Sequence, residues 1–319
     1  MSIPRYEIRS KLGSGYMGEV YHAFDAENNR DVALKFLPAR FTSEEDIARF
    51  RQESLILFRL DHPNVVRIYA FEEKVPNSHF ADTIFQSSQE YVYFIVDEFI
   101  PGLNLRQYMA ANKISPKDAV RIAIEIAKAL SHAHAKGVIH RDIKPDNIMV
   151  TSEGDVRVLD FGMAKFMGWF LEQQLALPMS QRVPVVITGP DEVLGTASYM
   201  SPEQWGQVQR DRQSAIDERT DVWSLGVVLY ELLTGINPFV ARTTEEVRML
   251  VALVHPPPLS EHMGRGSRRF QRIVSRALKK DRGDRYQAIE QMLHEMDNLL
   301  RRVERRWFPW QRINRVNHR

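Results

Sequence analysis

The sequence predicts a two-lobed α+β protein, with a small β-rich N-terminal lobe and a larger, mostly helical C-terminal lobe. Apolar and polar residues alternate over much of the first hundred residues, as in strands, and helical spacing dominates from about residue 115. The 319 residues are enough for two lobes around a cleft. Pro101-Gly102 interrupts the pattern. We therefore assign 1–99 to the N-lobe, 100–302 to the C-lobe and 303–319 to a basic aromatic tail.

Composition narrows the class of protein. Hydrophobic residues make up 44% and charged residues 26%, which is ordinary for a globular chain. Cysteine is absent, so disulfides and cysteine-ligated metals are excluded. The first residues lack the apolar stretch of a signal peptide, and no run of about 18 apolar residues occurs. Residues 301–319 carry seven Arg and one Glu, a net charge of +6. Because the whole chain has a net charge of +2, the other 300 residues carry a net charge of −4.

The N-lobe is expected to consist of strands with one helix. Strands are predicted over 6–15, on both sides of the turn 25–30 within 18–37, and over 64–73 and 90–99. A helix is expected to begin at Ser43, where Asp46 would complete a capping box. The polar stretch 74–89 is expected to be a loop.

The C-lobe is expected to be helical around one hairpin. Ser115 is the predicted N-cap, and Pro116 the first residue, of a helix that ends at Gly137. A hairpin is predicted over 147–162, with its turn at 151–155. The segment 165–194 shows no clear period. A buried helix is expected over 221–235, and amphipathic helices over 268–281 and 286–306.

A glycine-rich stretch, "GSGYMGEV", lies between the first two predicted strands. Gly13, Gly15 and Gly18 would let the backbone approach phosphate oxygens without interference from a Cβ atom. An ordinary glycine-rich hairpin is the alternative.

Lys35 and Glu53 form a candidate ion pair near this turn. Strand alternation places Ala33 and Lys35 on one face, although an isolated lysine there could simply be solvated. Glu53 shares the apolar stripe of its predicted helix, where a carboxylate needs a partner, and Lys35 is the obvious one.

"HRDIKPDN", residues 140–147, concentrates charge between two apolar segments, and "LDFG" follows the predicted hairpin. Asp142 could accept a proton from an attacking hydroxyl, and Lys144 could neutralise a phosphoryl group. Asn147 and Asp160 offer oxygen ligands that suit Mg²⁺. Phosphoryl transfer needs these parts: positioning, metal, charge neutralisation and an oriented nucleophile.

Together with "GTASYMSPE" (195–203) and "DVWSLG" (221–226), these motifs closely resemble the ordered signature of eukaryotic-like (Hanks-type) protein kinases. The resemblance runs from about Tyr6 to Arg302 and implies the bilobal protein-kinase fold. By resemblance, Asp142 is the catalytic base, Lys144 contacts the γ-phosphate, and Asn147 and Asp160 bind Mg²⁺, with Mn²⁺ as an alternative. His140 would pack near Phe161, and Lys35 would contact the α- and β-phosphates while pairing with Glu53.

The resemblance also implies an ATP pocket and a regulatory set. The pocket residues would be Leu12, Gly13, Ser14, Gly15, Gly18, Val20, Ala33, Lys35, Asp97, Glu98, Phe99, Ile100 and Met149. Arg141 would hold the activation segment, for which Thr188 is the first candidate phosphosite; Ser180 and Ser198 are weaker candidates, and Thr196 is a further regulatory candidate.

The substrate class follows from two residues. Lys144, two residues after Asp142, resembles the serine/threonine kinases, and Thr196 supports the same assignment. The segments around Ser201 and "DERTDVWSLG" look most like the bacterial receptor-like serine/threonine kinases. We therefore expect an ATP-dependent protein serine/threonine kinase that autophosphorylates. A nucleotide-responsive scaffold without turnover and a small-molecule phosphotransferase remain alternatives.

Three features depart from the family pattern. Asp97 occupies the gatekeeper position at the back of the adenine pocket, unless the alignment is shifted by one residue. It is expected to restrict ATP-site inhibitors and to contact the Lys35–Glu53 pair. The long activation segment, 160–203, contains an apolar stretch that is expected to pack on the kinase or a partner and to cover the peptide site before phosphorylation; a disordered insertion is the alternative.

The tail is the third departure. Its Arg residues, interleaved with Trp307, Phe308 and Trp310, suit an anionic membrane surface. A solvated helix end with packed aromatics is the alternative, and without a recognised nucleic-acid module no nucleic-acid partner is expected. The expected partners are proteins with Ser or Thr, and a second copy for autophosphorylation. The expected location is cytoplasmic, at the membrane's cytoplasmic face if a transmembrane segment follows residue 319.

Overall fold

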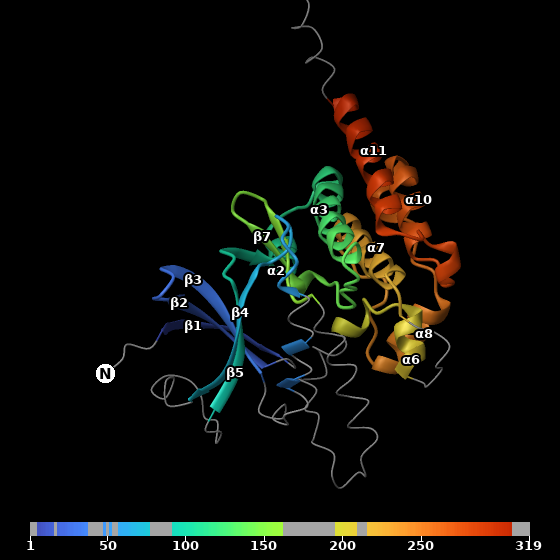
Figure 1. Ribbon diagram of the computed structural model, residues 1–319. Helices are drawn as coiled ribbons and strands as arrows, with labels where there is room; N and C mark the ends of the chain where they lie inside the picture. Colours follow the sequence, from blue (N-terminus) through green and yellow to red (C-terminus); the bar gives the residue numbers. More distant parts are fainter. Residues whose placement is uncertain are drawn as a thin grey trace, which may run out of the picture.

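The computed structural model has two lobes, a β-sheet lobe and a helical lobe (Figure 1). It describes residues 5–15, 18–37, 47–48, 51–52, 57–76, 91–161, 195–208 and 216–307. The α+β class and the order of the two lobes are as the sequence predicts.

The described residues of the N-lobe form a five-stranded antiparallel sheet in the order β1-β2-β3-β5-β4. Its strands are β1 (Tyr6–Gly15), β2 (Gly18–Asp25), β3 (Arg30–Phe36), β4 (Ile68–Pro76) and β5 (Tyr91–Glu98). In β2 and the first part of β3 buried residues alternate with less buried ones, which accounts for the success of the period-two pattern, whereas Leu34, Lys35 and Phe36 are all buried. Tyr21, Phe36 and Phe94 belong to the small core on one face of this sheet.

The helix predicted from Ser43 is described only in part. Residues 47–48, 51–52 and 57 are helical, in agreement with the prediction. Ser43, Asp46 and Glu53 lie outside the described residues, so the capping box and the position of that glutamate stay predictions.

The C-lobe begins with a small sheet and continues as helices. The sheet contains β6 (Gly102–Asn104), β7 (Ile148–Thr151) and β8 (Val156–Val158). In the described part of this lobe, the helices of more than one turn are α2 (Leu105–Ala111), α3 (Pro116–His134), α6 (Pro202–Val208), α7 (Arg219–Thr234), α8 (Thr244–Leu253), α10 (Arg268–Ala277) and α11 (Ile289–Trp307). The predicted boundary at residues 99 and 100 falls in the connection between β5 and β6.

Helix boundaries follow local chemistry. The Ser115 hydroxyl accepts a hydrogen bond from the Asp118 N–H, with Pro116 at the first helical position, as predicted. Helix α7 ends at Gly235, whose φ of 79° places it in the left-handed region that favours glycine. The sequence analysis missed α2 and α8, both of which start with a capping box, at Asn104 and Thr243 respectively.

Helix α7 runs through the centre of the large core and packs against α3, α10 and α11 (Figure 1). Thirteen of its sixteen residues are buried, which fits its apolar sequence. Gly226 permits close packing here, because a Cβ atom at this position would lie 2.8 Å from the Cβ of Ala277 on α10.

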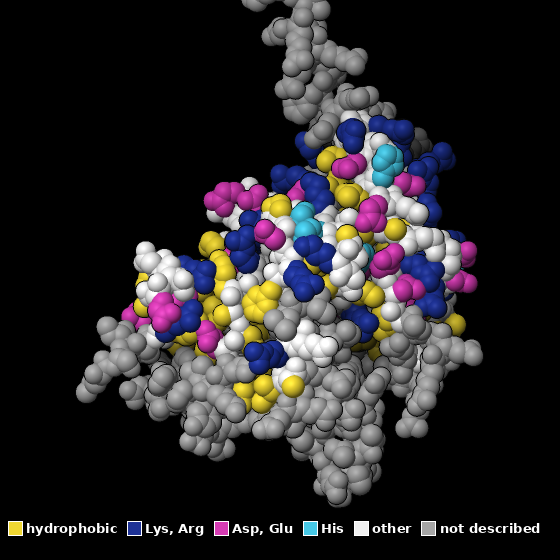
Figure 2. Space-filling view, viewed as in Figure 1, with side chains coloured by type: hydrophobic (Ala, Val, Ile, Leu, Met, Phe, Trp, Pro, Cys, Tyr) yellow, Lys and Arg dark blue, Asp and Glu magenta, His cyan; other side chains and the backbone are white. Residues whose placement is uncertain are grey.

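Charges of both signs share the exposed surface. On the face shown in Figure 2, basic side chains lie among acidic ones over the helical lobe. Electrostatic recognition on this face therefore depends on local groups of charges. Within the described ranges, no helix combines the length and apolar character that a membrane crossing requires.

Candidate active site

The predicted catalytic loop connects α3 to β7 and positions Asp142 through its own neighbours. The Asn147 side-chain amide donates hydrogen bonds to the Asp142 carbonyl and to its Oδ2, each 2.9 Å long. The Lys144 Nζ lies 3.0 Å from the same Oδ2 and donates to the Thr196 hydroxyl at 3.0 Å. The structure thus brings together three residues of "HRDIKPDN" with Thr196 of "GTASY".

A buried carboxylate on α7 anchors the start of this loop. Asp221 Oδ2 accepts the backbone N–H of His140 at 2.9 Å, and Oδ1 accepts that of Arg141 at 2.8 Å. His134 on α3 adds a third contact, with its Nε2 2.8 Å from Oδ2. Burial would raise the pKa of Asp221, but the His134 partner and these hydrogen bonds outweigh burial and hold it below its usual value.

Arg141 adopts a left-handed backbone conformation, with φ of 68°. Such a conformation is costly for a residue with a side chain and persists where the surroundings hold it. The Asp221 carboxylate bonds its N–H, and Gln204 on α6 donates to its carbonyl at 2.8 Å. The residue immediately before Asp142 is therefore fixed on both sides.

His140 has the structural role that the resemblance implied. Its ring is fully buried and packs edge-on against Phe161, with centroids 4.6 Å apart. Its Nε2 lies 2.7 Å from the Leu159 carbonyl, and its Nδ1 accepts the Asp142 N–H at 3.2 Å. Because both ring nitrogens contact backbone, His140 connects the catalytic loop to the segment that carries Asp160.

Lys35 reaches across from the N-lobe to Asp160, with its Nζ 2.7 Å from Oδ1. Burial would raise the pKa of Asp160, but the Lys35 charge and hydrogen bond outweigh burial and hold it below its usual value. Asp160 is therefore ionised when Lys35 is beside it. The predicted partner of Lys35, Glu53, lies outside the described residues, so that pairing stays a prediction, whereas the Asp160 contact was not foreseen.

The donor set fits a hard divalent cation. The Leu159 N–H donates to the Asn147 carbonyl at 2.9 Å, so the backbones that carry Asn147 and Asp160 are adjacent. With its Nδ2 bound to Asp142, Asn147 keeps its Oδ1 as a potential ligand, and Asp160 supplies an ionised carboxylate. Amide and carboxylate oxygens are the ligands that Mg²⁺ and Mn²⁺ take.

The residues predicted to surround a nucleotide lie along the sheet and its connection to the C-lobe. Gly13 pairs with Val20, and Gly15 with Gly18, whose φ of 111° favours glycine at this strand-turn-strand. Leu12 is about half exposed, at 49%, and Ser14 is also exposed. Glu98 ends β5 and is followed by Phe99 and Ile100, and Met149 is part-buried on β7 opposite Asn104.

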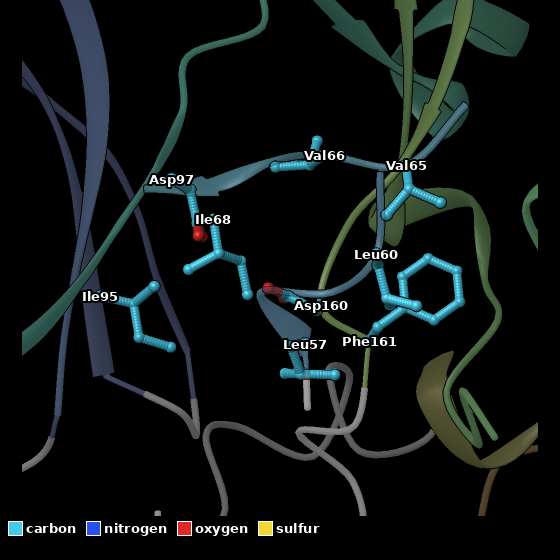
Figure 3. A pocket seen from close by; sticks show the side chains of 9 residues that line it. All are labelled: Leu57, Leu60, Val65, Val66, Ile68, Ile95, Asp97, Asp160 and Phe161. Atoms are coloured by element: carbon cyan, nitrogen blue, oxygen red, sulfur yellow. The ribbon is translucent and has the colours of Figure 1, made fainter. Parts of the chain in front are cut away.

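Asp97 is the last residue but one of β5 and lies opposite Ala33 of β3. It lines an apolar pocket with Ile68, Asp160, Phe161 and others (Figure 3). Within the described part of the chain its Oδ1 is buried without a hydrogen-bond partner. Burial, and secondarily the Asp160 charge, raise the pKa of Asp97 to about 7 even though Lys35 lowers it.

The sequence analysis missed several charged groups around the site. Arg285 is fully buried and forms two hydrogen bonds of 2.7 and 2.8 Å with Glu203, the last residue of the predicted activation segment. Asp221 lay within a quoted motif without an assigned role. Arg106 binds Asp146 of the catalytic loop. Thr188, Ser180 and residues 308–319 lie outside the described ranges.

Comparison with known proteins identifies the family. The family model described as protein kinase domain matches residues 6–296. The chain is 32% identical over 290 residues to the serine/threonine-protein kinase PrkC of Bacillus subtilis, covering 90% of this chain and 39% of that protein. It is 34% identical over 291 residues to the serine/threonine-protein kinase PknB of Mycolicibacterium smegmatis, covering 90% of this chain and 42% of that protein.

A probable serine/threonine-protein kinase of Streptomyces coelicolor is 35% identical over 298 residues, covering 93% of this chain and 40% of that protein. The chain thus spans about two fifths of the length of these bacterial relatives. It belongs to the protein kinase family, as the motifs predicted.

Proposed function

We propose that this member of the protein kinase family is an ATP-dependent protein serine/threonine kinase. The arrangement of Asp142 carries the proposal: its carboxylate is held by Asn147 and Lys144, and the Lys144 ammonium also binds Thr196 in the segment before α6. A base, a cation and a residue of the peptide-binding segment thereby meet at one point. A small-molecule kinase would not need the last of these.

In the proposed reaction, a Ser or Thr hydroxyl of the substrate attacks the γ-phosphorus of ATP. Asp142 accepts the hydroxyl proton, the bond from the γ-phosphorus to the bridging oxygen breaks, and ADP leaves. Lys144 offsets negative charge on the phosphoryl group, and Lys35 orients the α- and β-phosphates. Asn147 and Asp160 would hold the divalent ion, Mg²⁺ or Mn²⁺, which neutralises phosphate charge when bound.

The test is transfer of labelled γ-phosphate from Mg·ATP to the chain itself and to a generic protein substrate. Asp142→Asn and Lys35→Met would be compared with wild type, and nucleotide binding measured in parallel. Incorporation on Ser and Thr that Asp142→Asn abolishes while nucleotide still binds supports the proposal. Nucleotide binding without transfer by wild type would contradict it in favour of a scaffold.

Autophosphorylation by a second copy is part of the proposal, with Thr188 as the first candidate acceptor and Arg141 as the residue that would bind the phosphate. Support comes from the sequence of the activation segment and from the family. Mass spectrometry after incubation with Mg·ATP tests it. Phosphate absent from residues 163–195 would remove Thr188, and an incorporation rate per molecule that does not rise with protein concentration would contradict transfer between copies.

We also propose that residues 301–319 contact anionic membranes from the cytoplasmic side. The support is the alternation of Arg with Trp and Phe in the sequence. Co-sedimentation with vesicles rich in phosphatidylserine, compared with neutral vesicles, should be lost when 301–319 are removed. Equal binding by the shortened chain would exclude this contact.

A further inference from the structure

Arg106 lies beside the catalytic loop and binds two carboxylates there. Its Nε lies 2.9 Å from Oδ1 of Asp146 and its Nη2 lies 2.8 Å from Oδ2, a bidentate pair. Nη2 also donates to the Tyr199 hydroxyl at 3.3 Å, and Nη1 lies 3.8 Å from Oε1 of Glu231. Four separate segments therefore meet at one guanidinium: α2, the catalytic loop, the segment before α6, and α7.

The cluster would carry excess negative charge without this arginine. Burial, with a further contribution from Asp146, raises the pKa of Glu231, although Tyr199 and Arg106 lower it. Asp146 and Arg106 keep about two fifths of their side-chain surface exposed, at 41% and 43%. The site thus consists of a partly exposed acid, Asp146, and a buried one, Glu231, and a cation of the same chain already fills it.

Its position places this cluster next to an incoming peptide. Asp146 follows Asp142 by four residues in the same loop, and Lys144 binds both Asp142 and Thr196. Tyr199, three residues after Thr196, is a partner of Arg106. A peptide that delivers a hydroxyl to Asp142 therefore lies against the surface formed by Asp146 and Arg106.

We propose that Arg106 determines the charge preference for substrate peptides by occupying an acidic site that would otherwise bind a basic side chain. The inference rests on the proposed protein kinase function. A substrate arginine would have to displace a bidentate partner that is already in place, so it gains little. Removal of Arg106 opens the acidic pair, and a basic residue at the matching peptide position then gains a charged hydrogen bond.

The experiment compares peptide pairs that differ only by Arg or Gln, with the substitution moved along both sides of the acceptor serine. For wild type, kcat/KM for the two members should agree within about twofold at every position. In Arg106→Met the ratio should rise by about fivefold to thirtyfold at one position, as expected for a charged, partly exposed pair. Adding Asp146→Asn to Arg106→Met should remove most of this new preference for arginine. Arg121→Met, which replaces an exposed arginine on α3, serves as the matched control.

If Arg106 had a purely structural role, Arg106→Met would lower kcat/KM equally for both members of each peptide pair, and that result would overturn the inference. The inference would also be overturned if wild type preferred arginine as strongly as Arg106→Met does. Binding of labelled peptide pairs to Asp142→Asn, with and without Arg106→Met, measures the same ratio without turnover. Absent phosphoryl transfer by wild type counts against the proposed function, whereas an unchanged binding ratio counts against the role of Arg106.

Discussion

Replacement of Asp97 by Asn should change how stability depends on pH. Burial raises the pKa of Asp97 in the folded protein to about 7, above its ordinary value of 3.8. Between these values the folded protein retains a proton that the unfolded chain has released, so the free energy of unfolding falls as pH rises through this window and levels off above it. From about pH 5 to about pH 8 the loss from this one carboxyl is about 3 kcal/mol.

The assay is urea unfolding of the nucleotide-free protein in the presence of a chelator, at about pH 5 and at about pH 8. Asparagine has nearly the same shape but cannot ionise, so only wild type should lose the 3 kcal/mol. The difference between wild type and Asp97→Asn should therefore shift by about 3 kcal/mol in favour of the variant at the higher pH. Asp155→Asn, an exposed carboxylate in the turn after β7, is the control. A difference between wild type and Asp97→Asn that stays the same at both pH values would refute the reasoning.

Arg285→Met should lower the free energy of unfolding, measured by urea unfolding, by about 3–5 kcal/mol, because it leaves the Glu203 carboxylate buried without its partner. A loss below about 1 kcal/mol would contradict a stabilising role for this pair. Gly226→Ala should lower the free energy of unfolding by about 1–3 kcal/mol, because the added methyl group pushes α7 away from α10. Adding Ala277→Gly should restore part of this loss, and no restoration would mean that the contact between residues 226 and 277 is not its cause. Ser115→Ala should cost about 1 kcal/mol in a thermal melt, whereas Ser115→Asp should cost much less; equal losses would rule out capping.

The elements that the sequence predicts correctly are those with strong local signals. Strand β2 and the first part of β3 alternate in burial, and α3 carries its start signal at Ser115 and Pro116. Helix α7 is apolar nearly all round and lies in the core. The seven- and ten-residue helices α2 and α8 gave too little periodicity to be detected, although Asn104 and Thr243 mark their starts.

The site was predictable in its composition but less so in its pairings. The ordered motifs indicated Asp142, Asn147 and Asp160, because phosphoryl transfer needs those residue types. Which carboxylate contacts Lys35 depends on how the two lobes meet, and no local pattern contains that information. The same holds for Arg106, which looks like a helix-surface arginine in sequence and finds its partners only through tertiary contacts.

The geometry of the site depends on contacts that come from the C-lobe core. Arg141 and Asp160 adopt left-handed backbone conformations, with φ of 68° and 59°, each costing about 1–3 kcal/mol. Arg141 is held on both sides, by the Asp221 carboxylate and the Gln204 amide. Asp160 is held by its ion pair with Lys35 and by the bonds that the preceding residue, Leu159, makes to Asn147 and the His140 ring. Because Asp221 belongs to the buried helix α7, a shift of that helix would release the strain at Arg141 without touching a reacting group. Packing changes in α7 should therefore lower the rate of the proposed phosphoryl transfer as well as stability.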